Sequence, residues 1–477
     1  MRCTQSKRLR CVLWPAAITI LSGHVVQAAA VWPQFRGTNC AGVSESDQPP
    51  VEFGPATNLL WKTALPAGLS SPCIWEDRIF LTGFAEQKLR TLCMRRRDGK
   101  VLWRQFAPAE QIEEVNPDSS PASATPATDG ERVYSYFGSY GLLAYDFEGR
   151  EIWRKPLPLV VSLNGSGTSP VVMDGLVIVN RDQEEGKSSL LAVDARTGQT
   201  VWETPRPMFA SSYTTPILWQ RGTVKDVVLA GSLRVVGYGL KDGKEQWSAN
   251  GLEAISVCPT PVLGEGQLFT ASRSMGGMKL PSFASQQKEM DANADQKIAR
   301  DEAKGMIGSK PVFNAIDENK DGFITEAEWD ASVAMMSKGD WGIFALRAPG
   351  SGDVTATHVA WKNKRGAATV PSPLFYRGRL YLIQDGGRLT CYRAKTGEAL
   401  YEQERLEADG QYWASPVAAD GKIYFASTRG NVAVIEAADT LNVLARNKLG
   451  ERITATPAIA DDKLYVRAAN HLWAFGK

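Results

Sequence analysis

The sequence predicts an all-β fold, an eight-bladed β-propeller of four-stranded antiparallel blades with a small α-helical insertion in the fifth blade. Three observations support this prediction. A Ser/Thr-Pro step recurs along the chain, a hairpin signature with a Gly and a following aromatic residue recurs behind it, and one polar, helix-favouring stretch interrupts the series.

The Ser/Thr-Pro step marks the start of each repeat, because every one of these prolines precedes an apolar run. The prolines are Pro72, Pro126, Pro170, Pro216, Pro261, Pro373, Pro416 and Pro457. Successive prolines lie 54, 44, 46, 45, 112, 43 and 41 residues apart. Six spacings are near the length of one blade, and the spacing of 112 contains about 67 additional residues.

Each repeat contains short runs of β-branched and aromatic residues between Gly and Asp turn signals, as expected for four antiparallel strands. The third repeat reads TSPVVMDG, LVIVNRD, SLLAVDA and RTGQTVWE. An Asp-Gly, Glu-Gly or Thr-Gly step predicts the last hairpin turn, and we expect the aromatic residue behind it to pack between neighbouring blades. These aromatic residues are Trp103, Trp153, Trp202, Trp247 and Tyr401.

The two ends of the array predict how the ring closes. The last repeat ends after its third run, whereas Leu59 to Lys62 resembles a fourth strand without a repeat of its own. Joining the two completes an eighth blade and removes two exposed sheet edges.

The N-terminus predicts export. Basic residues at Arg2, Lys7, Arg8 and Arg10 precede a short apolar stretch and the small residues Ala28 to Ala30, the pattern of a signal peptide over residues 1–30. The apolar stretch is too short for a spanning helix, so we expect no membrane span after cleavage and a periplasmic or extracellular location.

Composition and cysteine content argue against several classes of function and of site. Lys+Arg number 54 against 52 Asp+Glu, which gives no charge excess for binding nucleic acid. After the signal peptide, the spacing of the cysteines fits neither a disulfide framework nor a zinc site, and their role stays open, with Cys73 and Cys93 as one candidate pair across blade 1. The five cysteines are Cys40, Cys73, Cys93, Cys258 and Cys391.

The insertion, residues 276–340, contains a calcium-loop motif. Residues 317–328, DENKDGFITEAE, fit D-x-[DN]-x-[DN]-G-x5-E at every specified position. Such a loop surrounds Ca²⁺ with side-chain oxygens, one backbone carbonyl and a bidentate Glu, while its Gly allows a sharp bend. The predicted ligands are Asp317, Asn319, Asp321, Phe323, Thr325 and Glu328.

A second loop, residues 291–302, lies 26 residues upstream and has Gln296 where the motif has Gly. A side chain at that bend costs roughly 1–2 kcal/mol, so we expect weaker calcium binding there. We also expect Ile298 to pair with Ile324 in a short β-bridge between the two loops. The predicted ligands are Asp291, Asn293, Asp295, Lys297 and Glu302.

The repeat, with S/T-P at its start and T-G-x-x-x-W near its end, resembles the pyrroloquinoline-quinone (PQQ)-like propeller family, and WPQFRG at residues 32–37 resembles the leader of secreted bacterial members. The resemblance implies domains at 31–57 (leader), 58–275 and 341–477 (propeller) around the paired EF-hand insertion. The family contains both quinoprotein dehydrogenases and non-catalytic scaffolds.

The resemblance implies the features that a quinoprotein would need. One of them is a pair of adjacent cysteines, which this chain lacks. Asn164 and Asp182 are isolated polar residues, for which turn and loop roles are expected, and the Gly-rich stretch 164–168 has no Lys. No specific residue supports PQQ. The sequence therefore favours a calcium-binding, non-catalytic scaffold with a protein or cell-envelope partner. The alternatives are a PQQ- and calcium-dependent oxidoreductase and a polysaccharide-associated protein.

Overall fold

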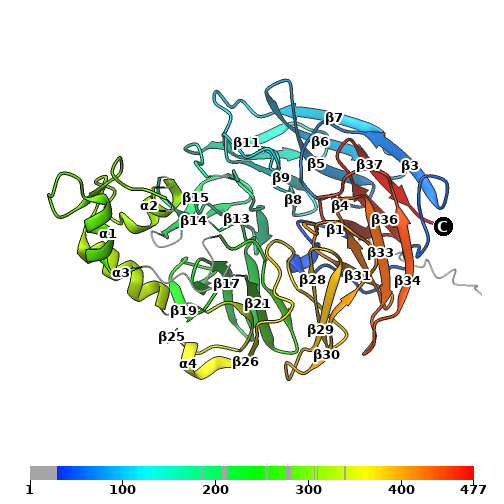
Figure 1. Ribbon diagram of the computed structural model, residues 1–477. Helices are drawn as coiled ribbons and strands as arrows, with labels where there is room; N and C mark the ends of the chain where they lie inside the picture. The colour runs from blue at the N-terminus through cyan, green and yellow to red at the C-terminus, as the bar shows by residue number, and fades with distance from the viewer. Residues whose placement is uncertain are drawn as a thin grey trace, which may run out of the picture.

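The computed structural model forms a ring of eight β-sheets with a helical insertion projecting from one side (Figure 1). The structure describes residues 30–162, 164–184, 186–206, 212–252, 256–273, 281–305, 307–308, 310–337 and 340–477. The predicted signal peptide lies outside the described residues except for Ala30.

The first four blades follow the chain, each with its strands in order from the inside of the ring outward. Blade 1 contains β4 (Cys73–Trp75), β5 (Arg78–Ala85), β6 (Lys88–Arg95) and β7 (Val101–Phe106). Blade 2 contains β8 (Ala127–Thr128), β9 (Arg132–Phe137), β10 (Gly141–Asp146) and β11 (Glu151–Pro156). Blade 3 contains β12 (Val171–Met173), β13 (Leu176–Asn180), β14 (Ser189–Asp194) and β15 (Thr200–Pro205). Blade 4 contains β16 (Ile217–Arg221), β17 (Val224–Gly231), β18 (Arg234–Gly239) and β19 (Glu245–Asn250).

The last four blades complete the ring. Blade 5 contains β20 (Val262–Gly264), β21 (Gln267–Ser272), β24 (Gly342–Arg347) and β26 (Val359–Asn363). Blade 6 contains β27 (Leu374–Tyr376), β28 (Arg379–Gln384), β29 (Arg388–Arg393) and β30 (Ala399–Arg405). Blade 7 contains β31 (Val417–Ala419), β32 (Lys422–Ala426), β33 (Asn431–Glu436) and β34 (Val443–Lys448). Blade 8 contains β35 (Ala458–Ala460), β36 (Lys463–Arg467), β37 (His471–Phe475) and β3 (Leu59–Ala64).

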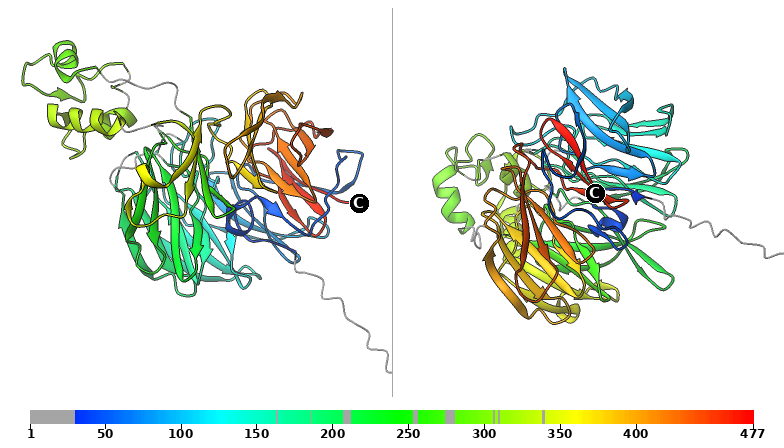
Figure 2. Two further views of the ribbon diagram at one scale, coloured as in Figure 1. Left: turned by 90° about the horizontal axis from the view of Figure 1, so that it is seen from below. Right: turned by 90° about the vertical axis from the view of Figure 1, so that its right-hand side faces the viewer.

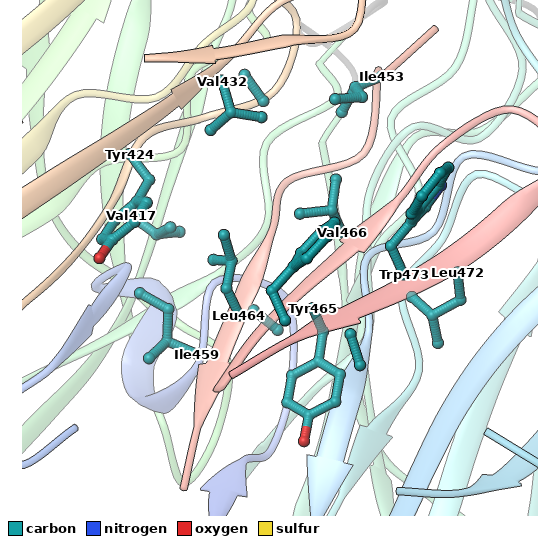
Figure 3. Close-up of a cluster of buried hydrophobic side chains, with 14 of the residues drawn as sticks. Val417, Tyr424, Val432, Ile453, Ile459, Leu464, Tyr465, Val466, Leu472 and Trp473 are labelled. Atoms are coloured by element: carbon teal, nitrogen blue, oxygen red, sulfur yellow. The ribbon is translucent and has the colours of Figure 1, made fainter. Parts of the chain in front are cut away.

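Ring closure occurs as predicted, because β3 from the N-terminal part pairs antiparallel with β37 from the C-terminus, with Lys62 opposite Trp473. The apolar contacts around this joint connect blades 7, 8 and 1 in one buried cluster. Figure 3 shows part of this cluster, with Val417 and Tyr424 of blade 7 and Leu464 and Val466 of blade 8.

The Ser or Thr of each Ser/Thr-Pro step forms a hydrogen bond between blades. At seven successive joints, from blade 1 to blade 8, its backbone N–H donates to the hydroxyl of the equivalent residue in the next blade. The donor and acceptor pairs are Ser71–Thr125, Thr125–Ser169, Ser169–Thr215, Thr215–Thr260, Thr260–Ser372, Ser372–Ser415 and Ser415–Thr456, at 2.9–3.3 Å. The proline that follows has no N–H and so adds no further buried donor.

The outer-strand tryptophans pack between blades in most repeats, as predicted. Trp103 Nε1 donates to the Phe147 carbonyl, and a Cβ on Gly149 would lie 2.8 Å from its ring, so the hairpin glycine makes room for the indole. Trp61, Trp153, Trp202 and Trp361 have equivalent bonds.

Trp247 is an exception to the predicted packing, whereas Tyr401 follows it. Trp247 turns back into its own blade, where its Nε1 donates to Asp226 and its ring meets Trp219 edge-on. A strap from blade 5 runs along this outer strand: β25 (Gly352–Asp353) pairs parallel with β19, and α4 (Thr355–His358) follows. Tyr401 is buried in contact with other residues of blades 6 and 7.

The leader, residues 31–57, runs along the inner strands and contacts seven blades. It forms β1 (Val31–Trp32), which pairs with β4, the 3-10 helix η1 (Thr38–Cys40), and β2 (Val43–Ser44), which pairs with β31. Hydrogen bonds join it to five more blades: Thr128–Pro33, Val172–Gln34, Leu218–Asn39, Arg36–Pro373 and Asp462–Asp47. Figure 2 shows this blue segment within the ring, away from the insertion.

The insertion lies between β21 and β24, the second and third strands of blade 5, which pair directly with each other. It contains α1 (Phe283–Met290), β22 (Ile298–Ala299), α2 (Lys310–Ile316), β23 (Phe323–Ile324) and α3 (Glu326–Ser337). Phe283, Phe313 and Trp329 belong to a buried cluster confined to this segment. The insertion therefore has a hydrophobic core of its own.

All five cysteines of the described region are free, so the candidate pairing of Cys73 with Cys93 is wrong. Burial is the main cause that raises the pKa of the Cys93 thiol to about 12. These thiols stay protonated and pack as small apolar groups.

Removing one of these hydroxyls tests how much an inter-blade hydrogen bond contributes to stability. Thr125→Val keeps the shape of the side chain but leaves the Ser71 N–H without an acceptor, so we expect the free energy of unfolding to fall by about 1–3 kcal/mol. Chemical denaturation measures this change. Thr200→Val, at an exposed position of β15, is the matched control. An equal loss in both variants would contradict the assigned role.

Candidate functional site

The second loop of the insertion, residues 317–328, folds around its own carboxylates. Asp317 is 1% exposed and accepts from the N–H groups of Asp321 and Gly322 at 3.2 and 3.1 Å. Glu328 folds back over the loop, with Oε2 accepting from Thr325 N at 2.9 Å and Oε1 from Asn319 N at 3.4 Å. The acidic side chains at both ends of the loop thus lie against its backbone.

The first loop, residues 291–302, has the same hydrogen bonds. Asp291 accepts from the N–H groups of Asp295 and Gln296 at 3.1 and 3.0 Å, and Glu302 accepts from those of Ala299 and Asn293 at 2.9 and 3.3 Å. Each bond has its counterpart 26 residues later in the second loop. Two different sequences therefore adopt one loop conformation.

The backbone bend at the sixth position occurs in both loops. Gly322 has φ 88° and Gln296 has φ 67°, so Gln296 adopts the left-handed conformation that a side chain disfavours. The Ile298–Ile324 pairing occurs as predicted and joins the loops through β22 and β23.

The other predicted ligands point their polar atoms at neighbouring loop groups. Asn319 Oδ1 accepts from Asp321 N at 2.8 Å, Asp321 Oδ1 from Phe323 N at 2.9 Å, and Thr325 Oγ1 donates to Glu328 at 2.7 Å. Among the described residues, no three His, Cys, Asp or Glu side chains are already gathered as a metal site. The donor chemistry fits calcium, because each loop offers several hard oxygen donors.

A second polar site lies in blade 3, on the side of the ring that carries the insertion. Asp182 follows β13 and forms a bidentate ion pair with Arg206, at 2.8 and 2.9 Å, in which both side chains are fully buried. Burial alone would lower the pKa of Arg206, but Asp182 and the Tyr238 hydroxyl raise it above the ordinary value. The guanidinium therefore stays charged.

Asn164 belongs to the same region. Its Nδ2 donates to the Tyr213 hydroxyl at 3.1 Å, and that hydroxyl also bonds Ser162 Oγ at 2.9 Å. The expectation of separate turn and loop roles for Asn164 and Asp182 is thus incomplete, because both enter one polar cluster, formed by connections between blades and by the β13–β14 loop within blade 3.

Glu113, which the sequence does not single out, joins this cluster from the connection between blades 1 and 2. Its side chain is 4% exposed; Oε2 accepts from Ser166 N at 3.0 Å, and Oε1 is buried without a hydrogen-bond partner. Burial raises the pKa of Glu113 to about 7, although the Ser166 bonds act in the opposite direction. No motif marks this residue, since its neighbours come from another blade.

The cluster encloses a cavity of about 10 Å³, lined by Tyr136, Ser166, Arg181, Asp182 and Tyr213 among others. That volume holds about one water molecule.

Protonation of Glu113 should make stability depend on pH. The folded pKa lies above the unfolded value of 4.5, so its contribution is complete below about pH 4.5 and is lost as pH rises through 7. Glu113→Gln should abolish this loss, on the order of 3 kcal/mol, and make the variant more stable than the parent at pH 8. Denaturation curves at pH 5 and 8 measure it, with exposed Glu114→Gln as the control. An unchanged pH dependence in Glu113→Gln would refute the assignment.

Comparison with known proteins supports one family. The family model described as outer membrane protein assembly factor BamB matches residues 88–296. No curated protein matches the sequence. Within the described residues, no helix combines the length and apolar character needed to cross a membrane.

Several solved structures share the fold at low identity. BamB from Moraxella catarrhalis has a TM-score of 0.54 at 14% identity, covering 87% of this chain and 99% of its own. The quinohemoprotein alcohol dehydrogenase ADHIIG from Pseudomonas putida HK5 has a TM-score of 0.53 at 12% identity, covering 94% and 80%. A europium-containing methanol dehydrogenase has 0.54 at 10%, covering 95% and 99%. The solved structures share the β-propeller fold, and the family-model match over residues 88–296 together with the eight repeated four-stranded blades supports the PQQ-like β-propeller family for this chain.

Proposed function

We propose that this chain is an exported, calcium-binding scaffold: a propeller of the periplasm or cell exterior that binds a protein or cell-envelope partner and whose insertion binds Ca²⁺. The observation that carries the calcium part is the shared conformation of the two loops. In both, the glutamate at the twelfth position folds back onto the backbone and the sixth residue has positive φ.

The loop residues would hold the ion as follows. Asp317, Asn319, Asp321 and Glu328 supply side-chain oxygens and Phe323 a backbone carbonyl, and Thr325 supplies a hydroxyl or orients a water. In the first loop, Asp291, Asn293, Asp295 and Glu302 supply the side chains and Lys297 the carbonyl. The strained Gln296 supports weaker binding there.

Two observations support a scaffold over an enzyme. The charges of the polar cluster are largely compensated internally, since Arg206 is paired with Asp182, and its cavity is near the size of one water. The matching family model is described as an assembly factor. A protein partner is therefore the class of ligand proposed for the propeller.

A PQQ- and calcium-dependent oxidoreductase is the second candidate, because Glu113 has the raised pKa that a buried general acid or base requires. The distant fold likeness to dehydrogenases adds no residue to this argument.

Calcium titration tests the first proposal. In the full chain we expect two binding events, the tighter lost in Glu328→Gln, which removes a charge from the bidentate ligand, and the weaker strengthened about tenfold in Gln296→Gly, which relieves the bend. Calorimetry measures both. At 100 times the dissociation constant, calcium should stabilise the insertion by about 2.7 kcal/mol.

The controls separate binding from misfolding. Glu318→Gln removes an equal charge at a position of the loop that supplies no predicted ligand, and should change the tighter affinity only slightly. The absence of heat at millimolar calcium in the parent chain would refute the calcium proposal.

The catalytic alternative has its own test. The full chain is mixed with pyrroloquinoline quinone, calcium, an artificial electron acceptor and a panel of alcohols and sugars. A scaffold should give no turnover above a protein-free control. Sustained turnover that falls in Glu113→Gln but not in Glu114→Gln would replace the scaffold proposal.

A further inference from the structure

Asn314, at the end of α2, links both loops of the insertion to the propeller. Its side chain is 6% exposed, and its Nδ2 donates to the Glu184 carbonyl of blade 3 at 3.4 Å. Glu184 lies in the connection between β13 and β14, two residues after Asp182 of the polar cluster. A contact between insertion and ring thus ends beside the buried ion pair.

One cation from each loop meets this asparagine. Arg300, the tenth residue of the first loop, donates to Asn314 Oδ1 and stacks over the Phe313 ring at 4.6 Å. Lys320, the fourth residue of the second loop, donates its Nζ to the Asn314 carbonyl at 2.5 Å. Neither residue is a predicted ligand. Each would therefore respond to a change in its own loop without binding the ion itself.

Lys320 lies among the residues that would hold an ion, since Asn319 and Asp321 on either side of it are predicted ligands. A divalent cation bound there would repel the positive charge of Lys320. Its ammonium group would then depend more strongly on the Asn314 carbonyl, which accepts its hydrogen bond.

On the propeller side of the contact, the segment 181–184 is hydrogen-bonded to a neighbouring connection of the ring. Glu184 N donates to the Val161 carbonyl at 3.1 Å, and Gln183 Oε1 accepts from Val161 N at 3.2 Å, so residues 181–184 are tied to the connection between blades 2 and 3. The Asp182–Arg206 pair lies within the same short segment.

We propose that Asn314 couples calcium occupancy of the insertion to residues 181–184, so that the ion regulates the polar cluster and the face of the propeller around it. This inference rests on the proposed calcium function and adds the route by which the ion acts on the ring. Asn314 is a positioning residue in this coupling and not an ion ligand.

Hydrogen exchange in the full chain, with calcium or with chelator, tests the coupling. In the parent, calcium should slow exchange several-fold in residues 291–302, 317–328 and 181–184. Asn314→Ala should retain the effect in both loops and lose it in 181–184. Exposed Lys288→Ala on α1 should behave like the parent.

A second variant guards against local misfolding in Asn314→Ala. Lys320→Gln keeps Asn314 and should reduce the calcium effect in 181–184 while the calorimetric isotherm persists. Protection confined to the loops in the parent, or an undiminished response of 181–184 in both variants, would overturn the coupling alone. No calcium effect in any segment would overturn the calcium function together with it.

Discussion

The ring depends on a hydrogen bond that recurs at the inner start of successive blades, where a Ser or Thr N–H donates to the hydroxyl of the equivalent residue in the next blade. In seven of the eight blades the inner strand has only two or three residues and offers little pairing surface of its own. The N–H of the Ser or Thr before it would otherwise be buried without a partner. The hydroxyl satisfies that donor and also sets the position of one blade relative to the next. The strands, the tryptophan contacts and the closure all require this relative position.

The leader also stabilises the inner surface of the ring, through strand pairing and hydrogen bonds to the blades. It pairs with β4 and β31 and bonds five further blades, so a segment distant from most of the repeats connects nearly the whole ring. Its Arg36 is fully buried and donates to the Pro373 carbonyl, with burial lowering its pKa to about 10. Burying this cation costs free energy, which the other contacts of the leader inside the ring have to offset.

The opposite side of the ring carries the polar cluster and the insertion. Connections between successive blades supply Glu113, Asn164 and Arg206, and the β13–β14 loop of blade 3 supplies Asp182. Helix α2 contacts this last loop. Buried ion pairs contribute little net stability, because desolvation offsets their attraction. We therefore interpret the cluster as a feature that fixes the relative positions of the loops. A calcium-responsive insertion placed against such loops would act on their arrangement rather than on the core.

The sequence alone determined the blade count, the closure by residues 59–62, the place of the insertion and the pairing of Ile298 with Ile324, because each follows from local periodicity or from motif spacing. It could also indicate the bend at Gln296, since a loop motif states which position needs positive φ. The tertiary structure alone decided the rest. Trp247 turns inward over Gly237, while a strap from blade 5 pairs with its strand. Glu113, Asp182 and Arg206 form one cluster because loops of different blades meet on one face. Such contacts join residues tens of positions apart and have no period, so no sequence pattern records them.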